Sequence, residues 1–190
     1  MDIIRTRYDK GGKILVADSV NWAGVGLACA FDDLPLAVNW LCKSTGVYIL
    51  VKYDEAIESG RYAVDPTVYI GESTNLHVRL QQHRGSESLK HGGWANAYAF
   101  YSAGNRLTGT HALHLEHQLI RLAQGRCMLK NEQINNNAPG GANDLVIGEA
   151  EMFLDNLVKT AKLLGVDFLD REPKPLDDGR LWKEVETEDS

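Results

Sequence analysis

The segment from Thr67 to His83, TVYIGESTNLHVRLQQH, changes character at Gly71. The four residues before this glycine, Thr67 to Ile70, form a β-prone run. Polar residues after it lead into a helical pattern, where Arg79 and His83 are four residues apart and therefore lie on one helix face. This strand–turn–helix corner is either an ordinary solvated corner or part of a site that binds a phosphate.

The rest of the chain alternates between strand and helix patterns. Apolar and polar residues alternate, or β-prone residues gather, in four further runs: residues 13–20, 25–31, 44–53 and 94–103. Helical patterns occupy four places: a short one from Asp32 or Asp33 to Leu41, one capped by Ser73, Thr74 or Asn75, one from Thr110 to Gly125, and one from Asp144 to Gly165. The first two strands predict a hairpin over residues 13–31. The order predicts an α+β domain with a small, mainly antiparallel sheet.

The composition is that of one globular domain with an uneven charge. The chain has 190 residues, of which 44% are hydrophobic and 24% charged, with a net charge of -6. Residues 151–190 contain eleven acids and six bases, whereas residues 46–139 contain eight acids and nine bases. We expect residues 171–190 to form a loosely ordered acidic tail. Mild acidity is unusual for a protein that binds nucleic acid, which normally gathers Lys and Arg.

Cysteines and apolar segments indicate the compartment. The three cysteines are widely spaced, and no Cys-x-x-Cys occurs, so neither a structural disulfide nor a zinc site is expected. The first ten residues, MDIIRTRYDK, lack the apolar segment of a signal peptide. The longest apolar region, residues 24–42, is interrupted by Asp32, Asp33 and Pro35 and is not a membrane span. We therefore expect a cytoplasmic protein.

Two strands place a tyrosine close to a glycine. Gly46-Val47-Tyr48 begins one strand, and Tyr69-Ile70-Gly71 ends the next. Side chains alternate along a strand, so a tyrosine near a glycine has room above the glycine at the sheet surface. Most strand tyrosines simply pack and make one hydrogen bond, and these two fit that role as well.

Glu116 lies inside the helical pattern of residues 110–125, on a face that it shares with Leu113 and Ile120. A carboxylate on an apolar face must be paired, hydrogen-bonded or bound to a metal, because burying it alone is costly. The alternative is a half-exposed glutamate at the edge of the apolar stripe.

Taken together, these motifs resemble the GIY-YIG nuclease family. The resemblance covers residues 46–139 and rests on the two tyrosine motifs, on Asn75-Leu76 with Arg79 and His83, and on Glu116 followed by a later asparagine. It implies a divalent-metal-dependent phosphodiesterase with a three-stranded antiparallel sheet flanked by helices. The expected organisation is an N-terminal hairpin and helix extension (1–45), a nuclease-like domain (46–140), a C-terminal helix (141–170) and the acidic tail.

The resemblance also implies a role for six positions. Tyr48 activates water or orients the site, Tyr69 supports the nucleophile, Arg79 binds the scissile phosphate, His83 is the His or Tyr one turn further on, Glu116 binds Mg²⁺ or Mn²⁺, and Asn131 or its rival Asn135 is the late asparagine. These residue types suit the reaction, because a metal on a carboxylate stabilises developing charge and an arginine pairs bidentately with a phosphate.

Two features depart from the family pattern. Glu72 stands directly after Tyr-Ile-Gly, where many members have a lysine, and its carboxylate repels a phosphate unless it points away. The connection from Lys52 to Asp65 is longer than usual and is a candidate contact for substrate or for a partner.

Other polar and aromatic groups have two interpretations each. His111, His114 and His117 either form a metal site or are ordinary surface or hydrogen-bonded histidines, and they lack the His-Glu-x-x-His spacing. The aromatic residues of the 94–103 strand either stack on bases or pack in the core: Trp94, Tyr98 and Tyr101.

The expected function is that of an endonuclease acting on nucleic acid, with DNA as the expected substrate, in restriction, repair, mobile-element or phage-defence work. One alternative is an inactive module of the same fold that binds nucleic acid or a protein. A third is a scaffold that works through the helix at residues 144–165. A single site that cuts both strands needs either a homodimer or two encounters, and the C-terminal helix or the acidic tail offers a surface for a protein partner.

Overall fold

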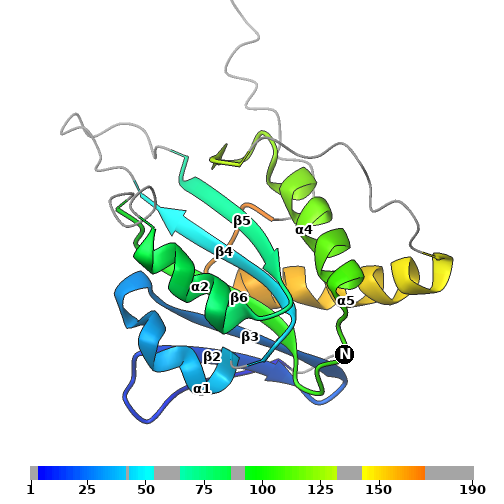
Figure 1. Ribbon diagram of the computed structural model, residues 1–190, viewed down its shortest axis with the longest axis horizontal. Coiled ribbons are helices and arrows are strands. Elements are labelled where there is room, and N and C mark those ends of the chain that lie inside the picture. The colour runs from blue at the N-terminus through cyan, green and yellow to red at the C-terminus, as the bar shows by residue number, and fades with distance from the viewer. Residues whose placement is uncertain (1–3, 42, 54–64, 87–92, 132–142, 170–190) are drawn as a thin grey trace, which may run out of the picture.

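A computed structural model describes residues 4–41, 43–53, 65–86, 93–131 and 143–169 (Figure 1). Its centre is a seven-stranded sheet in the order β1-β2-β3-β6-β4-β5-β7. The strands are β1 (Ile4–Tyr8), β2 (Ile14–Ser19), β3 (Trp22–Ala30), β4 (Gly46–Lys52), β5 (Thr67–Ser73), β6 (Asn96–Ser102) and β7 (Met128–Leu129). All neighbours are antiparallel except β5 and β7, which are parallel.

This sheet is larger than the three strands that we expected. The expected strands are its centre, β6-β4-β5, but the predicted hairpin of β2 and β3 continues the same sheet instead of forming a separate extension. The join is the pairing of β3 with β6, in which Gly26 lies opposite Phe100. Adding β3 satisfies the backbone groups along the edge of β6, which a three-stranded sheet leaves open.

The helices are η1 (Phe31–Ala37), α1 (Val38–Leu41), α2 (Leu76–Gly85), α4 (Gly109–Ala123) and α5 (Asp144–Leu163). Asn75, one of the three predicted caps, begins α2 through its side chain and the Val78 N–H. The predicted start of α4 at Thr110 was wrong: the helix begins at Gly109, and Thr108 is its N-cap. His111 Nδ1 accepts from the Thr108 N–H at 3.1 Å, so the histidine completes this cap.

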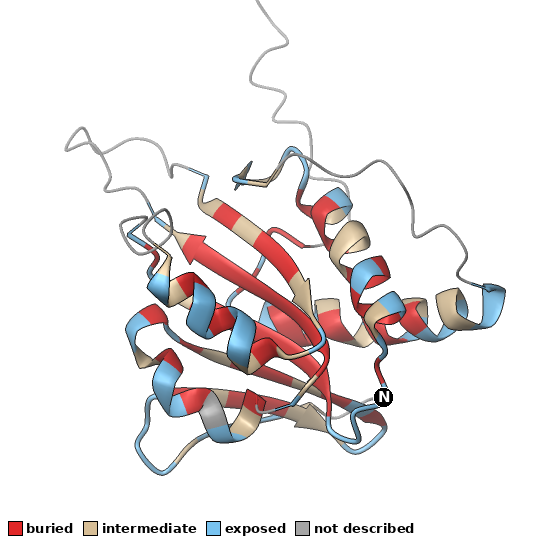
Figure 2. Ribbon diagram, viewed as in Figure 1, coloured by how far each residue is buried: buried red, intermediate tan, exposed pale blue. Residues whose placement is uncertain are grey.

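Helices cover both faces of the sheet, and each face has its own core (Figure 2). Alternate residues of β4 supply the two cores: Val47 and Ile49 pack towards α4 and α5, whereas Tyr48 and Leu50 pack towards α2 and η1. Burial on both faces explains why β4 lacks an alternating pattern in the sequence.

Some expectations fall outside the described residues. These are the acidic tail at 171–190, most of the connection between Lys52 and Asp65, and Asn135. Within the described ranges, none of the helices has both the length and the apolar character needed to cross a bilayer.

Candidate active site

The two glycines of the tyrosine motifs are required by close contacts. Tyr48 lies opposite Gly71 in the β4–β5 pairing, and a Cβ at residue 71 would lie 2.3 Å from the Tyr48 hydroxyl oxygen. A Cβ at Gly46 would lie 2.1 Å from the Phe100 carbonyl oxygen. Glycine at these positions therefore lets the Tyr48 side chain cross β5 and lets β4 approach β6.

Tyr48, Tyr69 and His83 form one aromatic cluster at the corner between β5 and α2. The Tyr48 hydroxyl oxygen lies 2.5 Å from His83 Nε2. The ring centroid of His83 lies 5.2 Å from that of Tyr48 and 5.2 Å from that of Tyr69. Burial, with the charge of Arg79, lowers the pKa of His83 to about 4. His83 is thus neutral at pH 7, so its Nε2 can accept the Tyr48 hydroxyl proton.

Arg79 faces the same tyrosines from α2. The neighbouring Tyr48 hydroxyl raises the pKa of Arg79, and a weaker interaction with Tyr69 acts in the same direction. Burial raises the pKa of Tyr48 above its usual value, and Arg79 offsets only part of that increase. The corner therefore combines a permanent positive charge with a neutral phenol and a neutral imidazole.

Glu116 approaches this corner from α4 and meets Glu72 of β5. Burial, followed by repulsion from the Glu72 carboxylate, raises the pKa of Glu116 to about 7. The Glu72 backbone N–H donates to the Glu116 carboxylate, and Arg79 attracts it; both effects act in the opposite direction. The pKa of Glu72 is itself raised by burial and lowered by Arg79. Glu72 therefore does not point away from the site: its carboxylate is close enough to act on Glu116 and Arg79.

Asn131 uses its amide to fix the backbone of β5. Its Nδ2 donates to the Ile70 carbonyl at 2.5 Å, and its Oδ1 accepts from the Ile70 N–H at 3.3 Å. Ile70 lies between Tyr69 and Gly71, so this pair of bonds holds the strand that carries both motif residues. Asn131 is therefore a positioning residue, and its amide is already occupied.

Glu116 is the best candidate for a metal ligand. Among the residues that the structure describes, no three His, Cys, Asp or Glu side chains gather as a metal site would require. A site built on Glu116, with Glu72 beside it, suits Mg²⁺ or Mn²⁺, because such ions accept one or two carboxylates and take water or substrate oxygens for the rest. The two carboxylates repel each other, which a divalent cation would relieve.

The three histidines of α4 do not form a metal site. His111 Nε2 lies 3.1 Å from a Glu149 carboxylate oxygen, and His114 Nε2 lies 2.7 Å from one of Glu151. Both histidines are buried and join α4 to α5. The hydrogen-bonding interpretation is the correct one for these two residues.

The aromatic residues of β6 are core residues. Trp94, Tyr98 and Tyr101 are each less than one-tenth exposed, so the interpretation in which they stack on bases is wrong. Strand β6 lies between β3 and β4 and therefore exposes little surface to a nucleic acid. A local sequence pattern cannot reveal this central position.

No family model, no curated protein and no solved structure matches this chain. The arrangement of the corner is thus the main basis for assigning a function.

Proposed function

We propose that this protein is a divalent-metal-dependent endonuclease that hydrolyses phosphodiester bonds, with DNA as the expected substrate. One observation carries the proposal: the Tyr48 hydroxyl oxygen lies 2.5 Å from His83 Nε2 beside the Tyr69 ring, and the charge of Arg79 acts on both tyrosines and on the Glu116 carboxylate. Residues from β4, β5, α2 and α4 thus contribute a cation, two phenols, an imidazole and a carboxylate to one corner. The order of these motifs, which resembles the GIY-YIG family, supports the same assignment.

Each residue has a task that its surroundings allow. Arg79 is charged at every relevant pH, and its planar guanidinium can bind a phosphate through two hydrogen bonds. The Nε2 of neutral His83 accepts a hydrogen bond from the Tyr48 hydroxyl, so a lone pair of the Tyr48 oxygen remains available to orient a water for attack. Tyr69 packs against both rings and fixes their positions. A divalent ion bound at Glu116 would neutralise negative charge on the phosphate.

Cleavage of plasmid and oligonucleotide substrates tests this proposal. Supercoiled DNA, single- and double-stranded DNA and RNA are incubated with Mg²⁺ or Mn²⁺, and the products are separated on gels. We expect metal-dependent cleavage that falls at least about 100-fold in Glu116→Ala and in Arg79→Ala. Arg121→Ala, which removes an exposed arginine of α4, is the control and should retain activity. Metal-dependent cleavage that survives both site variants would falsify the assignment.

The second candidate function is a catalytically inactive module that binds nucleic acid or a protein. Glu72 favours it, because a second carboxylate beside Arg79 weakens the attraction for a phosphate. This candidate predicts no turnover with either metal, together with DNA binding that persists in Glu116→Ala.

A further inference from the structure

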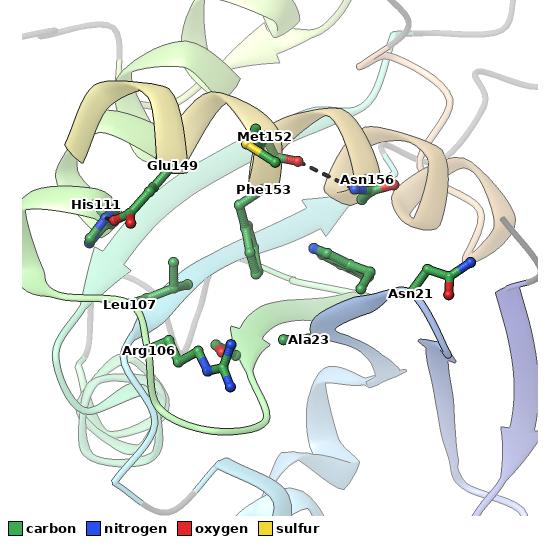
Figure 3. A pocket seen from close by; sticks show the side chains of 11 residues that line it. Asn21, Ala23, Arg106, Leu107, His111, Glu149, Met152, Phe153 and Asn156 are labelled. Atoms are coloured by element: carbon green, nitrogen blue, oxygen red, sulfur yellow. Dashed lines mark hydrogen bonds and ion pairs between the residues drawn. The ribbon is translucent and has the colours of Figure 1, made fainter. Parts of the chain in front are cut away.

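A pocket of about 360 Å³ lies between β3, β6, α4 and α5, apart from the corner described above (Figure 3). None of the six site residues named above lines it. Its size falls within the range of small-molecule sites, which begins at roughly 300 Å³. Figure 3 places Met152, Phe153 and Asn156 on the α5 side, across from Arg106 and Leu107.

Two residues that line this pocket each have a buried polar atom without a hydrogen-bond partner in the described part of the chain. These atoms are Trp22 Nε1 and Ser102 Oγ, and no described residue satisfies either. Trp22 is 9% exposed and Ser102 is 4% exposed, so bulk water does not explain how they are satisfied. A buried polar group that is left unpaired costs about 1–3 kcal/mol, and native proteins contain few of them. Two unpaired buried groups in one pocket favour a ligand that offers hydrogen-bond acceptors to both.

The position of Trp22 is fixed by its neighbours. Its ring centroid lies 4.9 Å from that of Phe153. A Cβ at Gly24 would lie 2.1 Å from the indole, so the ring rests over this glycine. The indole N–H is therefore held in the pocket wall, and it can only donate.

The charged groups of the pocket lie at two ends. Arg106 has no recorded ion-pair partner in the described part of the chain, whereas Glu149 is already paired with His111. Figure 3 shows this pair on the side of the pocket away from Asn21. Three of the lining residues can donate hydrogen bonds: Trp22, Ser102 and Arg106. A ligand group with several acceptor oxygens would satisfy all three.

We propose that this pocket binds a small molecule with a carboxylate or phosphate group on an apolar body. The oxyanion accepts from Trp22, Ser102 and Arg106, while Phe153 and Leu107 contact the apolar part. This inference is independent of the nuclease proposal, because the two sites share no residue.

Nuclear magnetic resonance of the full chain tests the pocket through Trp22. The four tryptophans give separate ¹⁵N indole signals, and that of Trp22 is assigned from backbone-linked spectra, without a variant. Phenylacetate, phenyl phosphate, inorganic phosphate and neutral phenylacetamide are titrated in turn. We expect a saturable shift of the Trp22 signal with phenylacetate or phenyl phosphate, and about tenfold weaker binding in Arg106→Gln. Arg121→Gln should bind as the unmodified chain does.

The probes separate the outcomes. A response to phenylacetate alone assigns a carboxylate ligand, and a response to phenyl phosphate alone assigns a phosphate ligand. The proposal is overturned if neither acid shifts the Trp22 signal, if phenylacetamide binds equally well, or if inorganic phosphate matches phenyl phosphate. Unchanged binding in both Arg106→Gln and Ser102→Ala overturns it as well.

Discussion

The surroundings of Glu116 disfavour the ionised form of its side chain. Its pKa rises from 4.5 unfolded to about 7 in the fold, so the native state binds more protons than the unfolded state between these values. The contribution of Glu116 to stability is therefore greatest below pH 4.5 and is lost as pH rises to about 7. The full shift corresponds to at most about 3 kcal/mol, and partial exposure reduces this to about 1–2 kcal/mol.

Glu116→Gln should remove this loss, because a neutral amide has no charge to desolvate. We expect the variant to exceed the unmodified chain by about 1–2 kcal/mol above pH 7 and to lack the decline between pH 4.5 and 7. Urea unfolding in EDTA across this range measures the difference. Asp32→Asn, at an exposed acid of η1, should leave the decline unchanged. Parallel pH profiles for the Glu116 variant and the unmodified chain would contradict this explanation.

Gly71 gives Tyr48 the space in which its hydroxyl meets His83. An added methyl group would lie 2.3 Å from that hydroxyl, so Gly71→Ala must displace the ring. We expect a loss of about 1–3 kcal/mol in the free energy of unfolding, together with reduced cleavage. Gly148→Ala is the matched control: it lies in α5 with nothing within 4 Å, and it should gain up to about 1 kcal/mol from helix propensity. Equal effects of the two substitutions on unfolding would show that the contact with Tyr48 is unimportant.

Tyr69, Arg79 and His83 could be related to one another from the sequence because their spacing is local, whereas Tyr48 and Glu116 were joined to them only through the family resemblance. A period of two fixes which side of β5 carries Tyr69, and a separation of four sets Arg79 and His83 on one face of α2. The pocket at Trp22 could not be predicted in this way. Ser102 and Phe153 reach it only through the pairing of β3 with β6 and the packing of α5, which no local pattern records.

Beyond the short pairing with β7, the Asn131 side chain holds the outer edge of strand β5. Asn131 bonds both backbone groups of Ile70, next to the two-residue strand β7. Asn131→Ala removes both bonds and should cost about 1–3 kcal/mol, since it leaves partly buried backbone groups unpaired. Cleavage should fall through a lower kcat with little change in KM, because the strand that carries Tyr69 and Gly71 loses its position.

Asn131→Asp provides the conservative comparison, since it keeps the acceptor for the Ile70 N–H and loses the donor. Its stability and kcat should lie between those of the unmodified chain and Asn131→Ala. Urea unfolding and steady-state cleavage measure the two effects. Asn156→Ala, which removes an exposed amide that donates to the Met152 carbonyl, should change neither by much. A fall in kcat without any loss of stability in Asn131→Ala would indicate direct contact with substrate instead of positioning.

At the level of elements, the predictions were right where periodicity, β propensity or a helix cap gave a local signal. The hairpin of β2 and β3, the central strands and the helices α2, α4 and α5 all match expected segments. Strands β1 and β7 were missed, because the three interior residues of IRTRY are all polar and ML is too short for any period. Their place is set by the sheet edges that they cover. The number of strands in the sheet therefore depends on tertiary pairing and not on local sequence patterns.

Two regions of the molecule, the corner around Arg79 and the pocket at Trp22, suit ligands of opposite charge. The corner gathers two carboxylates near Arg79, and we propose that it binds a divalent cation, whereas the pocket at Trp22 gathers donors, and we propose that it binds an anion. Helix α4 contributes Glu116 to the corner and His111 to the pocket, so both depend on the same docking of α4 and α5.

Net charge controls how strongly a polyanion can approach the corner. The chain carries -6, and residues 171–190 contain seven acids and four bases, so deleting them leaves -3. Repulsion between like charges is felt over about 10 Å at 0.1 M salt and fades at higher salt.

We expect the shortened chain to bind DNA about two- to fivefold more tightly at about 50 mM salt, with the gain absent at about 500 mM. Fluorescence anisotropy with a labelled duplex measures both conditions. A variant with the seven acids changed to their amides carries +1 and should bind at least as tightly as the shortened chain, because it keeps the segment and removes its negative charge. Equal affinities for all three proteins at low salt would rule out a role for the acidic segment in DNA binding.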